Sequence, residues 1–544
     1  MGFAFIPAAL FAQESSASPQ AVISLETLNV QAQTAYQAGL YAQSAALYAR
    51  ALALTPAVER ADEEYSLACS QARAGDRAAA LATLGRAVDD GYMDSNSAAA
   101  DPNLSSLRGD PAWKPLLARM DALHAAQDAR WGDAAFATPY AEDISDAEKL
   151  AGLSELWAQA KYGFANFWHV PDLNWDQAYR EYIPKVLATK STAEYYLVLV
   201  RFYALLEDGH TNVHFPGQIF GQYGRLPLQT RLIDGRVLVI GSRNPAADLQ
   251  GIRPGDEIVS IDGVAVRRWA EQNVAPYVSA SSPQDRIEKI YNNNLFAATI
   301  GTQFTLITQT PSGVQSKHLF TVVKFAPSQR PKFELKMLPD KIAYVALNEF
   351  GDDMDVKEWN SHWPEIAKAR ALILDLRENG GGDASVGSRI LSTLINNPTP
   401  EARSQATRWI ANYRAWNQGE LPFQQPLGSI VPDPKRHFSG PVVWLTSPRT
   451  YSAAEDTTVV FAQSQRGKIV GEPTGGSTGQ PLFFKLPGGG SARVCTRYES
   501  FADGRTFIGV GIQPDIPVHA TRADIVVGRD SVLAKAVQML QTAP

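Results

Sequence analysis

The spacing of apolar and polar residues divides the chain into a helical first part, a middle part of short strands and a last part in which strands and helices alternate. From 143 to 208 the spacing is that of amphipathic helices, with Leu153, Leu156 and Trp157 on one face. The apolar run 195–206 is broken by Arg201, and this predicts a buried helix rather than a membrane span. The aromatic residues of this region indicate a helical subdomain with an aromatic core.

Residues 25–92 contain an internal repeat of 36 residues. Small and aromatic residues recur at the places where two helices turn or approach each other: Gly39, Tyr41, Tyr48, Ala51 and Pro56, then Ala68, Gly75, Ala80, Leu84 and Ala87. The pattern resembles two degenerate tetratricopeptide repeats. That resemblance implies a concave face that binds a peptide or protein partner or docks a neighbouring domain. A plain helical N-terminal cap stays open as the alternative.

The middle part predicts short strands separated by Gly and Pro turns, and 236–240 is the clearest of them. The run 251–256 forms a turn, the alternating strand 257–261 follows, and Asp262 and Gly263 make a second turn. This succession resembles a PDZ domain, which binds peptide C-termini as an added edge strand. A purely structural β domain is the alternative.

From Lys341 on, apolar strands alternate with helices, which is typical of an α/β domain. The buried strand 371–375 leads into Arg377, Asn379 and three glycines at 380–382. Consecutive glycines let the backbone approach a ligand and direct N–H groups into a site. The spacing and the lysine of a phosphate-binding loop are missing, so an oxyanion hole fits better.

A serine follows a second apolar strand, 442–445, at the junction with a helical segment. In Tyr451, Ser452, Ala453, Ala454, Glu455, the serine hydroxyl and the next N–H would both face a site at the positive end of the helix. The same residues also suit an ordinary helix cap, with Glu455 completing a capping box. Taken alone, this motif favours the cap.

The third candidate is His210 in the run Glu207 to Thr211, because a serine nucleophile needs a base and histidine suits neutral pH. The spacing of the other seven histidines selects none of them, and no HxxxH pair indicates a metal. We therefore expect no metal and no organic cofactor.

Together these motifs resemble the tail-specific, or C-terminal-processing, serine protease family over about 153–518. The resemblance includes Val470-Gly471-Glu472-Pro473-Thr474-Gly475-Gly476 and Gly511-Ile512-Gln513-Pro514-Asp515-Ile516. The resemblance implies a ClpP/crotonase-like α/β catalytic domain that cleaves peptide bonds through an acyl-enzyme. It implies Ser452 as nucleophile and, as oxyanion donors, the N–H of Ala453 with that of Gly381 or Gly382.

The family has two catalytic designs. In the Ser-Lys design the base lies about 25 residues after the serine, where this chain has Ser477, so that dyad is not expected. The design that resembles the tricorn core protease uses an upstream histidine, and His210 matches it. Two positions depart from that pattern, because Gly209 stands where a serine is expected and Ile508 where a glutamate is expected. The acid that orients His210 is left open among Asp208, Glu455, Glu472 and Glu499.

Composition and charge fit this interpretation without selecting it. Lysine and arginine total 50 against 56 acidic residues, a net charge of −6 without a basic run, so nucleic acid is not an expected partner. The two cysteines, Cys69 and Cys495, predict no disulfide framework. The apolar stretch 3–12 resembles the end of a secretory signal although no positive residue precedes it, and it predicts export to a periplasmic or extracellular space without stable membrane insertion.

We thus predict a multidomain exported serine peptidase acting on a peptide or protein substrate. A non-proteolytic binding protein on the same fold, for a retinoid, another hydrophobic ligand or a peptide, and a scaffold with an incidental hydrolase domain stay open as alternatives. The expected parts are a signal-like segment at 1–20, a tetratricopeptide-like region at 25–125, a helical subdomain with His210 at 141–215, a PDZ-like domain at 225–325 and the catalytic domain at 330–544.

Overall fold

The computed structural model describes residues 24–244, 246–325, 330–351, 353–419, 422–425 and 427–542. The predicted signal-like segment, 1–20, lies outside the described residues. The chain divides into two compact units, Met1–Met120 and Asp121–Pro544. Among the described residues, none of the helices is both long and apolar enough to cross a membrane.

The first unit is helical, and its helices pack through small residues. Ala32, Ala51, Ala68 and Ala80 are fully buried, so neighbouring helices approach closely there. Gly39 and Gly75 adopt positive φ angles of 77° and 91° in the turns that end two of the helices. The elements are α1 (Leu25–Gln37), α2 (Tyr41–Leu52), η1 (Ala57–Glu59), α3 (Arg60–Ala74), α4 (Arg77–Asp89), α5 (Ser95–Ala100), η2 (Pro102–Leu107) and the start of α6 (Trp113–Trp131).

In the second unit, a helical layer carries an aromatic core, as the sequence predicts. Trp175 stacks on Phe202 with ring centroids 4.3 Å apart, and Ser145 and Glu148 form a capping box at the start of α7. The layer comprises η3 (Ala134–Phe136), α7 (Asp146–Gly163), η4 (Phe167–His169), α8 (Trp175–Leu187), α9 (Thr192–Ala204) and α10 (Gly217–Phe220).

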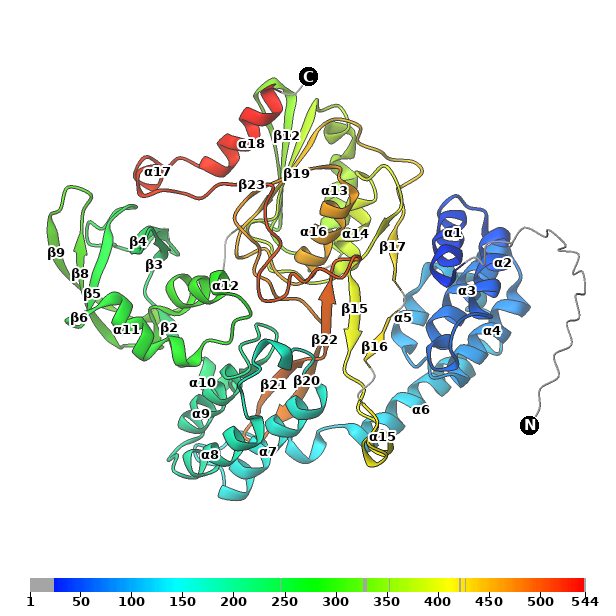
Figure 1. Ribbon diagram of the computed structural model, residues 1–544, viewed down its shortest axis with the longest axis horizontal. Helices are drawn as coiled ribbons and strands as arrows, with labels where there is room; N and C mark the ends of the chain where they lie inside the picture. Colours follow the sequence, from blue (N-terminus) through cyan, green and yellow to red (C-terminus); the bar gives the residue numbers. More distant parts are fainter. Residues whose placement is uncertain are drawn as a thin grey trace, which may run out of the picture. The chain divides into compact units, whose positions relative to one another are not determined.

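A hairpin from far along the chain completes this core. The strands β20 (Pro481–Leu486) and β21 (Gly490–Cys495) pair with each other, and β21 also pairs with β1 (Asn212–His214). Phe484 and Val494 are buried among the helices. Figure 1 shows the hairpin beside α7 and α9. The helical layer therefore shares its core with a segment of the predicted catalytic region.

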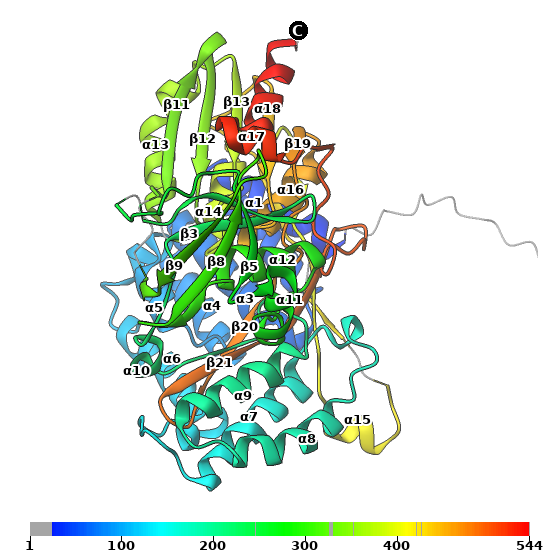
Figure 2. The same cartoon turned by 90° about the vertical axis from the view of Figure 1, so that its left-hand side faces the viewer.

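The next part is an antiparallel sheet of order β3-β4-β5-β8-β9, with β6 paired to β5 (Figure 2). The predicted strands at 236–240 and 257–261 are confirmed. Asp262 and Gly263 both have positive φ, as an Asp-Gly hairpin turn requires. The bounds are β2 (Tyr223–Arg225), β3 (Leu228–Ile233), β4 (Arg236–Ser242), β5 (Glu257–Ile261), β6 (Val264–Ala265), α11 (Val266–Asn273), η5 (Ala275–Tyr277), α12 (Pro283–Ile287), the π-helix η6 (Glu288–Asn294), β7 (Ala297–Thr299), β8 (Gln303–Gln309), β9 (Gln315–Thr321) and β10 (Val323–Lys324).

The last part has the predicted α/β form. Its six-stranded sheet runs β11-β12-β13-β18-β19-β23 and is parallel except for β11. Helices α13, α14 and α16 cover one face and α18 covers the other. The elements are β11 (Phe333–Leu338), η7 (Pro339–Lys341), β12 (Ile342–Leu347), α13 (Asp353–Ile366), β13 (Ala371–Asp375), α14 (Ala384–Leu391), β18 (Val442–Thr446), α16 (Ala453–Ser464), β19 (Gly467–Gly471), β23 (Ile516–Pro517), α17 (Arg522–Val527) and α18 (Ser531–Thr542).

Two smaller sheets extend from this part. One joins β14 (Thr399–Pro400) to β17 (Ser429–Ile430). The other has the order β16-β15-β22 and contains β15 (Arg403–Ala406), β16 (Phe423–Gln424) and β22 (Arg497–Ser500), with α15 (Ala411–Ala415) between the first two. Ser404 lies opposite Glu499 and Gln405 opposite Tyr498, so alternate pairs face opposite sides of this sheet.

Candidate active site

The site lies where the parallel strands β13, β18 and β19 end. Carboxyl ends of parallel strands meet at one edge of a sheet, and the loops that follow them are the usual place for a ligand. The loops are joined to each other by hydrogen bonds. The Thr450 hydroxyl donates to the Leu376 carbonyl at 2.8 Å, and the Ser452 N–H donates to the Ser477 carbonyl at 3.0 Å.

Ser452 precedes α16 in a strained backbone conformation, with φ 55° and ψ −130°. A non-glycine residue is held there only by its surroundings, and such strain is common at functional sites. The Ser452 side chain caps no helix N–H, and Glu455 bonds to another loop, so the helix-cap interpretation does not describe it. Ser452 is partly exposed.

The structure brings His210 to Ser452 across 242 positions of sequence. Its Nε2 lies 2.9 Å from the Ser452 Oγ. The His210 ring is buried and lies nearly parallel to the ring of Tyr451. Burial, with the positive charges of Arg493 and Lys289 nearby, lowers the pKa of His210 to about 3, so the imidazole is neutral at physiological pH and able to accept a proton.

The second ring nitrogen of His210 meets a residue to which the sequence assigned no role. Nδ1 lies 2.9 Å from the Ser477 Oγ, and Ser477 is the residue that stands where the other design of the family has its lysine. Glu455 holds the loop of Ser477 in place, because its carboxyl group accepts from the N–H groups of Gly476 at 2.8 Å and Ser477 at 2.9 Å. Burial raises the pKa of Glu455 to about 8.

Burial raises the pKa of Tyr451, and the Ser477 side chain opposes that shift. Tyr451 donates to Asp285 Oδ2 at 3.1 Å, and Lys289 Nζ lies 2.9 Å from the same oxygen. Asp285 is buried, and burial raises its pKa while Lys289 opposes that shift. A series of polar groups therefore runs from His210 to a carboxyl group on α12.

Steric crowding explains why residue 209, directly before His210, is a glycine. A Cβ at Gly209 would lie 1.5 Å from the Tyr451 hydroxyl oxygen, so the place where the tricorn-like pattern has a serine is filled by a tyrosine side chain. The Gly209 N–H donates to the Ser281 Oγ at 2.9 Å, which fixes the loop. Ile508, at the position expected for a glutamate, is buried in the apolar core of the α/β domain.

The four candidate acids do not contact the His210 ring. Asp208 accepts from the backbone N–H of His210 at 2.9 Å, Glu455 binds the 474–477 loop, and Glu472 pairs with Arg231 at 2.8 Å. Glu499 pairs with Arg497 elsewhere.

The glycine loop packs directly against the nucleophile segment. A Cβ at Gly381 would lie 2.6 Å from the Ser452 Cβ, and Gly381 has φ 97°, so only glycine fits there. The Gly381 N–H already donates to Asn379 Oδ1 at 2.9 Å. For the N–H groups of Gly382 and Ala453, no acceptor is found among the described residues. Gly382 and Ala453 thus keep free donors beside Ser452.

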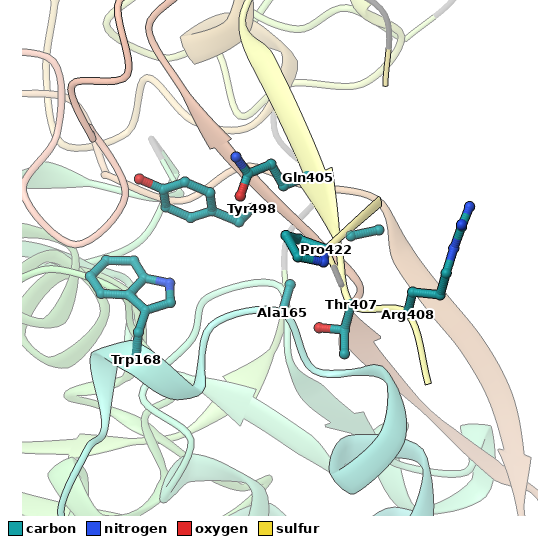
Figure 3. A pocket seen from close by; sticks show the side chains of 8 residues that line it. Ala165, Trp168, Gln405, Thr407, Arg408, Pro422 and Tyr498 are labelled. Atoms are coloured by element: carbon teal, nitrogen blue, oxygen red, sulfur yellow. The ribbon is translucent and has the colours of Figure 1, made fainter. Parts of the chain in front are cut away.

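A cavity of about 450 Å³ lies between η4 and the β16-β15-β22 sheet (Figure 3). Trp168 and Tyr498 meet edge to face at its wall, with ring centroids 5.5 Å apart, and Gln405 lies beside Tyr498. The cavity combines aromatic surface with polar groups. As for metals, the described part of the chain contains no cluster of three or more His, Cys, Asp or Glu side chains placed to hold an ion.

An α/β sheet with a strained serine at a helix start, in contact with a buried histidine, is an arrangement typical of serine hydrolases. Comparison with known sequences agrees. Residues 341–518 match peptidase family S41, and residues 236–302 match the "Bacteroidetes, Peptidase, S41 family, N-terminal domain". Over these two segments the chain is similar to peptidase family S41.

Two curated relatives are similar over long segments. A chloroplastic C-terminal processing peptidase of Tetradesmus obliquus is 24% identical over 273 residues, which span 50% of this chain and 54% of that protein. A carboxyl-terminal-processing protease of Synechocystis sp. is 25% identical over 398 residues, or 70% of this chain and 82% of that one. The fold is similar to the crystal structure of mature CPAF, with a TM-score of 0.60, 17% identity, and coverage of 73% of this chain and 98% of the other.

Proposed function

We propose that this chain cleaves peptide bonds through an acyl-enzyme formed on Ser452, with His210 as the base. The observation that carries the proposal is the 2.9 Å contact between the Ser452 Oγ and His210 Nε2 at a strained strand-to-helix turn. A binding protein has no need of a serine held in such backbone strain against a neutral base. The partial exposure of Ser452 also disfavours a scaffold with an incidental hydrolase domain.

In this mechanism the Ser452 oxygen attacks the substrate carbonyl carbon while His210 Nε2 takes the hydroxyl proton. The tetrahedral intermediate collapses when His210 gives that proton to the leaving amine. A water molecule then attacks the ester by the same route and restores Ser452. The neutral imidazole, which the lowered pKa of His210 favours, is the form that starts the cycle.

The oxyanion of the intermediate needs donors placed in advance. We assign this role to the N–H groups of Ala453 and Gly382, because both lie in segments packed beside Ser452 and neither has an acceptor among the described residues. Gly381, the other candidate from the sequence, has a different role in this proposal. Its N–H is engaged by Asn379, and its missing side chain lets the two loops touch.

We assign the orientation of His210 to Ser477, with Tyr451 and Asp285 behind it. When Nε2 accepts from Ser452, Nδ1 carries the proton and donates to the Ser477 oxygen. The Ser477 proton then points to the Tyr451 oxygen, and Tyr451 donates to Asp285. Each contact in this series of side chains uses one proton, so the series selects the tautomer that carries its proton on Nδ1. The carboxyl group of Asp285 stands at its far end.

The β3–β9 sheet is proposed to be a PDZ-like domain that recognises or gates substrate C-termini. Its outer strands β3 and β9 are each paired on one side only within the sheet, and such an edge accepts an added peptide strand. The segment after the sheet's helix α11 reaches the site. Ser279 Oγ donates to the Asp208 carbonyl at 2.7 Å, and Ser282 Oγ donates to the Gly475 carbonyl at 2.7 Å.

The N-terminal helices are proposed to be a tetratricopeptide-like region that binds a protein partner. Successive helix pairs start 35 and 36 residues apart, in agreement with the repeat in the sequence. Export also belongs to this proposal and rests on the apolar stretch 3–12. Sequencing the N-terminus of the protein secreted or retained by its host cell tests it.

A fluorophosphonate probe tests the central proposal, because it reacts with an activated serine and needs no known substrate. Labelling is expected for the unaltered protein and lost in Ser452→Ala and His210→Ala. The matched control is Ser361→Ala, which removes an exposed hydroxyl on α13 that bonds only within its helix. A folded protein that is not labelled, or labelling that survives Ser452→Ala, overturns the proposal.

A further inference from the structure

A second cavity, of about 230 Å³, lies on the opposite side of the β16-β15-β22 sheet from the one in Figure 3. Its walls come from α14, α16, β15 and β22. These walls continue the segments that carry the proposed chemistry. Helix α14 begins two residues after Gly382, and α16 begins directly after Ser452. Two of its lining residues, Ala384 and Asp456, lie two and four positions after Gly382 and Ser452.

Polar atoms without partners face this cavity. Ser404 and Glu499 are both more than nine-tenths buried, and within the part of the chain that the structure describes, the Ser404 Oγ and the Glu499 Oε2 have no hydrogen-bond partner. They are direct cross-strand partners, so their side chains stand on the same face of the sheet, and both line the cavity. Buried polar groups in folded proteins are nearly always paired, and these two are thus placed to bind something that enters.

Carboxyl groups dominate the cavity. Glu401, Asp456 and Glu499 line it together with a single guanidinium, that of Arg497. Burial is the main cause that raises the pKa of Asp456, and the charge of the nearby Glu499 is the second. Burial also raises the pKa of Glu401, with the nearby Glu499 as the second cause. Close carboxyl groups out of water favour either a shared proton or a bound cation.

The distance from Ser452 to Asp456 matches the length of a long substrate side chain. Asp456 lies one helical turn after Ser452, and its N–H donates to the Ser452 carbonyl at 3.1 Å. One turn of four residues rises about 6 Å. The four-carbon stem of a lysine spans a similar length from the residue that is attacked. Thr478, next to Ser477, donates to Asp456 at 2.8 Å and fixes its position.

The geometry points to a specificity pocket for a lysine or arginine side chain on the substrate residue whose carbonyl Ser452 attacks. The ammonium or guanidinium donates to Glu499, Asp456 and the Ser404 oxygen and takes the place of the shared proton. An acidic side chain meets three carboxyl groups there and is excluded. This inference rests on the proposed acyl-enzyme function, because the pocket is defined relative to Ser452.

Peptidyl diphenyl phosphonates test this inference, because they react covalently with a nucleophilic serine as an acylating substrate does. The reagents of the set differ only in one side chain. The set has lysine, norleucine, glutamine or glutamate at the attacked residue, and norleucine keeps the stem of lysine without its charge. The rate of inactivation is measured for each. We expect lysine to react about tenfold or more faster than norleucine and glutamine, and glutamate slowest.

The variants Glu499→Gln and Ser404→Ala should both reduce the ratio of lysine to norleucine rates. Ser404→Ala removes only one oxygen, so it still tests the pocket if Glu499→Gln does not fold. Glu365→Gln removes a half-exposed carboxylate on α13 and should leave the ratio unchanged. If lysine is not preferred while the fluorophosphonate probe still labels Ser452, this inference falls and the proposed function stands. If Ser452 reacts with neither reagent, both fall.

Discussion

Ser477 Oγ lies 2.9 Å from His210 Nδ1, although 267 positions of sequence separate the two residues. The contact gives the imidazole a partner on the side away from Ser452, where a triad has its carboxylate. It also shows what occupies the lysine position of the Ser-Lys design in this chain. A hydroxyl takes that place, and the proposed base, His210, comes from a different part of the chain.

Replacing Ser477 by alanine should slow fluorophosphonate labelling by about ten- to a hundredfold, because a buried imidazole N–H left without an acceptor costs about 1–3 kcal/mol. The residue does not touch the substrate in this proposal, so the apparent affinity for the probe should change little. Labelling kinetics at several probe concentrations separate the two effects. Ser477→Thr, which keeps the hydroxyl, should recover part of the rate. Equal rates for the alanine variant and the unaltered protein would remove Ser477 from the mechanism.

The glycine loop offers a matched pair of substitutions. A Cβ at Gly381 would lie 2.6 Å from the Ser452 Cβ, whereas a Cβ at Gly380 has nothing within 4 Å. Gly381→Ala should therefore abolish labelling and lower the thermal midpoint, because the loop must move away from the nucleophile. Gly380→Ala should retain most of the labelling and change the thermal midpoint little. The proposed packing is wrong if the two variants behave alike.

The pH dependence follows from the neutral state of His210. Its pKa of about 3 in the folded protein lies below that of a free imidazole, which is about 6.5. A protonated imidazole cannot accept the Ser452 proton, so the labelling rate should be nearly constant from pH 8 to 5 and show no midpoint near 6.5. Between pH 6.5 and 3 the unfolded chain binds a proton at this residue that the folded chain does not, so His210 lowers stability as the pH falls.

Rates measured from pH 5 to 8, with thermal midpoints over the same range, check both expectations. The loss of stability on acidification should be smaller in His210→Ala, which lacks the group. A labelling rate that falls with a midpoint near 6.5 would show that the histidine is exposed to water in the reactive state.

The sequence predicted the elements but only part of the site. Ser452, the glycine loop and His210 each stand in a local motif, and strand-to-helix patterning placed the first two at one edge of a sheet. Ser477 has no such signal of its own, because a serine in a Gly- and Thr-rich loop is ordinary until its contact with His210 is known. Asp285 lies in the segment after the predicted PDZ-like strands, where sequence gives no sign of a link to Tyr451.

The fold also explains why Gly209 and Ile508 differ from the residues of the tricorn-like pattern. In sequence they are departures from the tricorn-like pattern, and they put the orientation of His210 in doubt. In the structure Ile508 fills an apolar core, so a carboxylate there would be buried without a partner. The polar chain runs instead through Tyr451, on the side that Gly209 leaves open.

Gly209 and Tyr451 should therefore be energetically coupled. Gly209→Ala places a methyl group 1.5 Å from the Tyr451 hydroxyl, and it should lower the thermal midpoint and the labelling rate. Tyr451→Phe removes that hydroxyl, and it should slow labelling alone because Ser477 loses its link to Asp285. In the double variant much of the clash is gone, so the loss of stability should be smaller than the sum of the single losses, by about 0.5–3 kcal/mol. Additive losses in this double-mutant cycle would mean that the tyrosine is not what makes glycine necessary before His210.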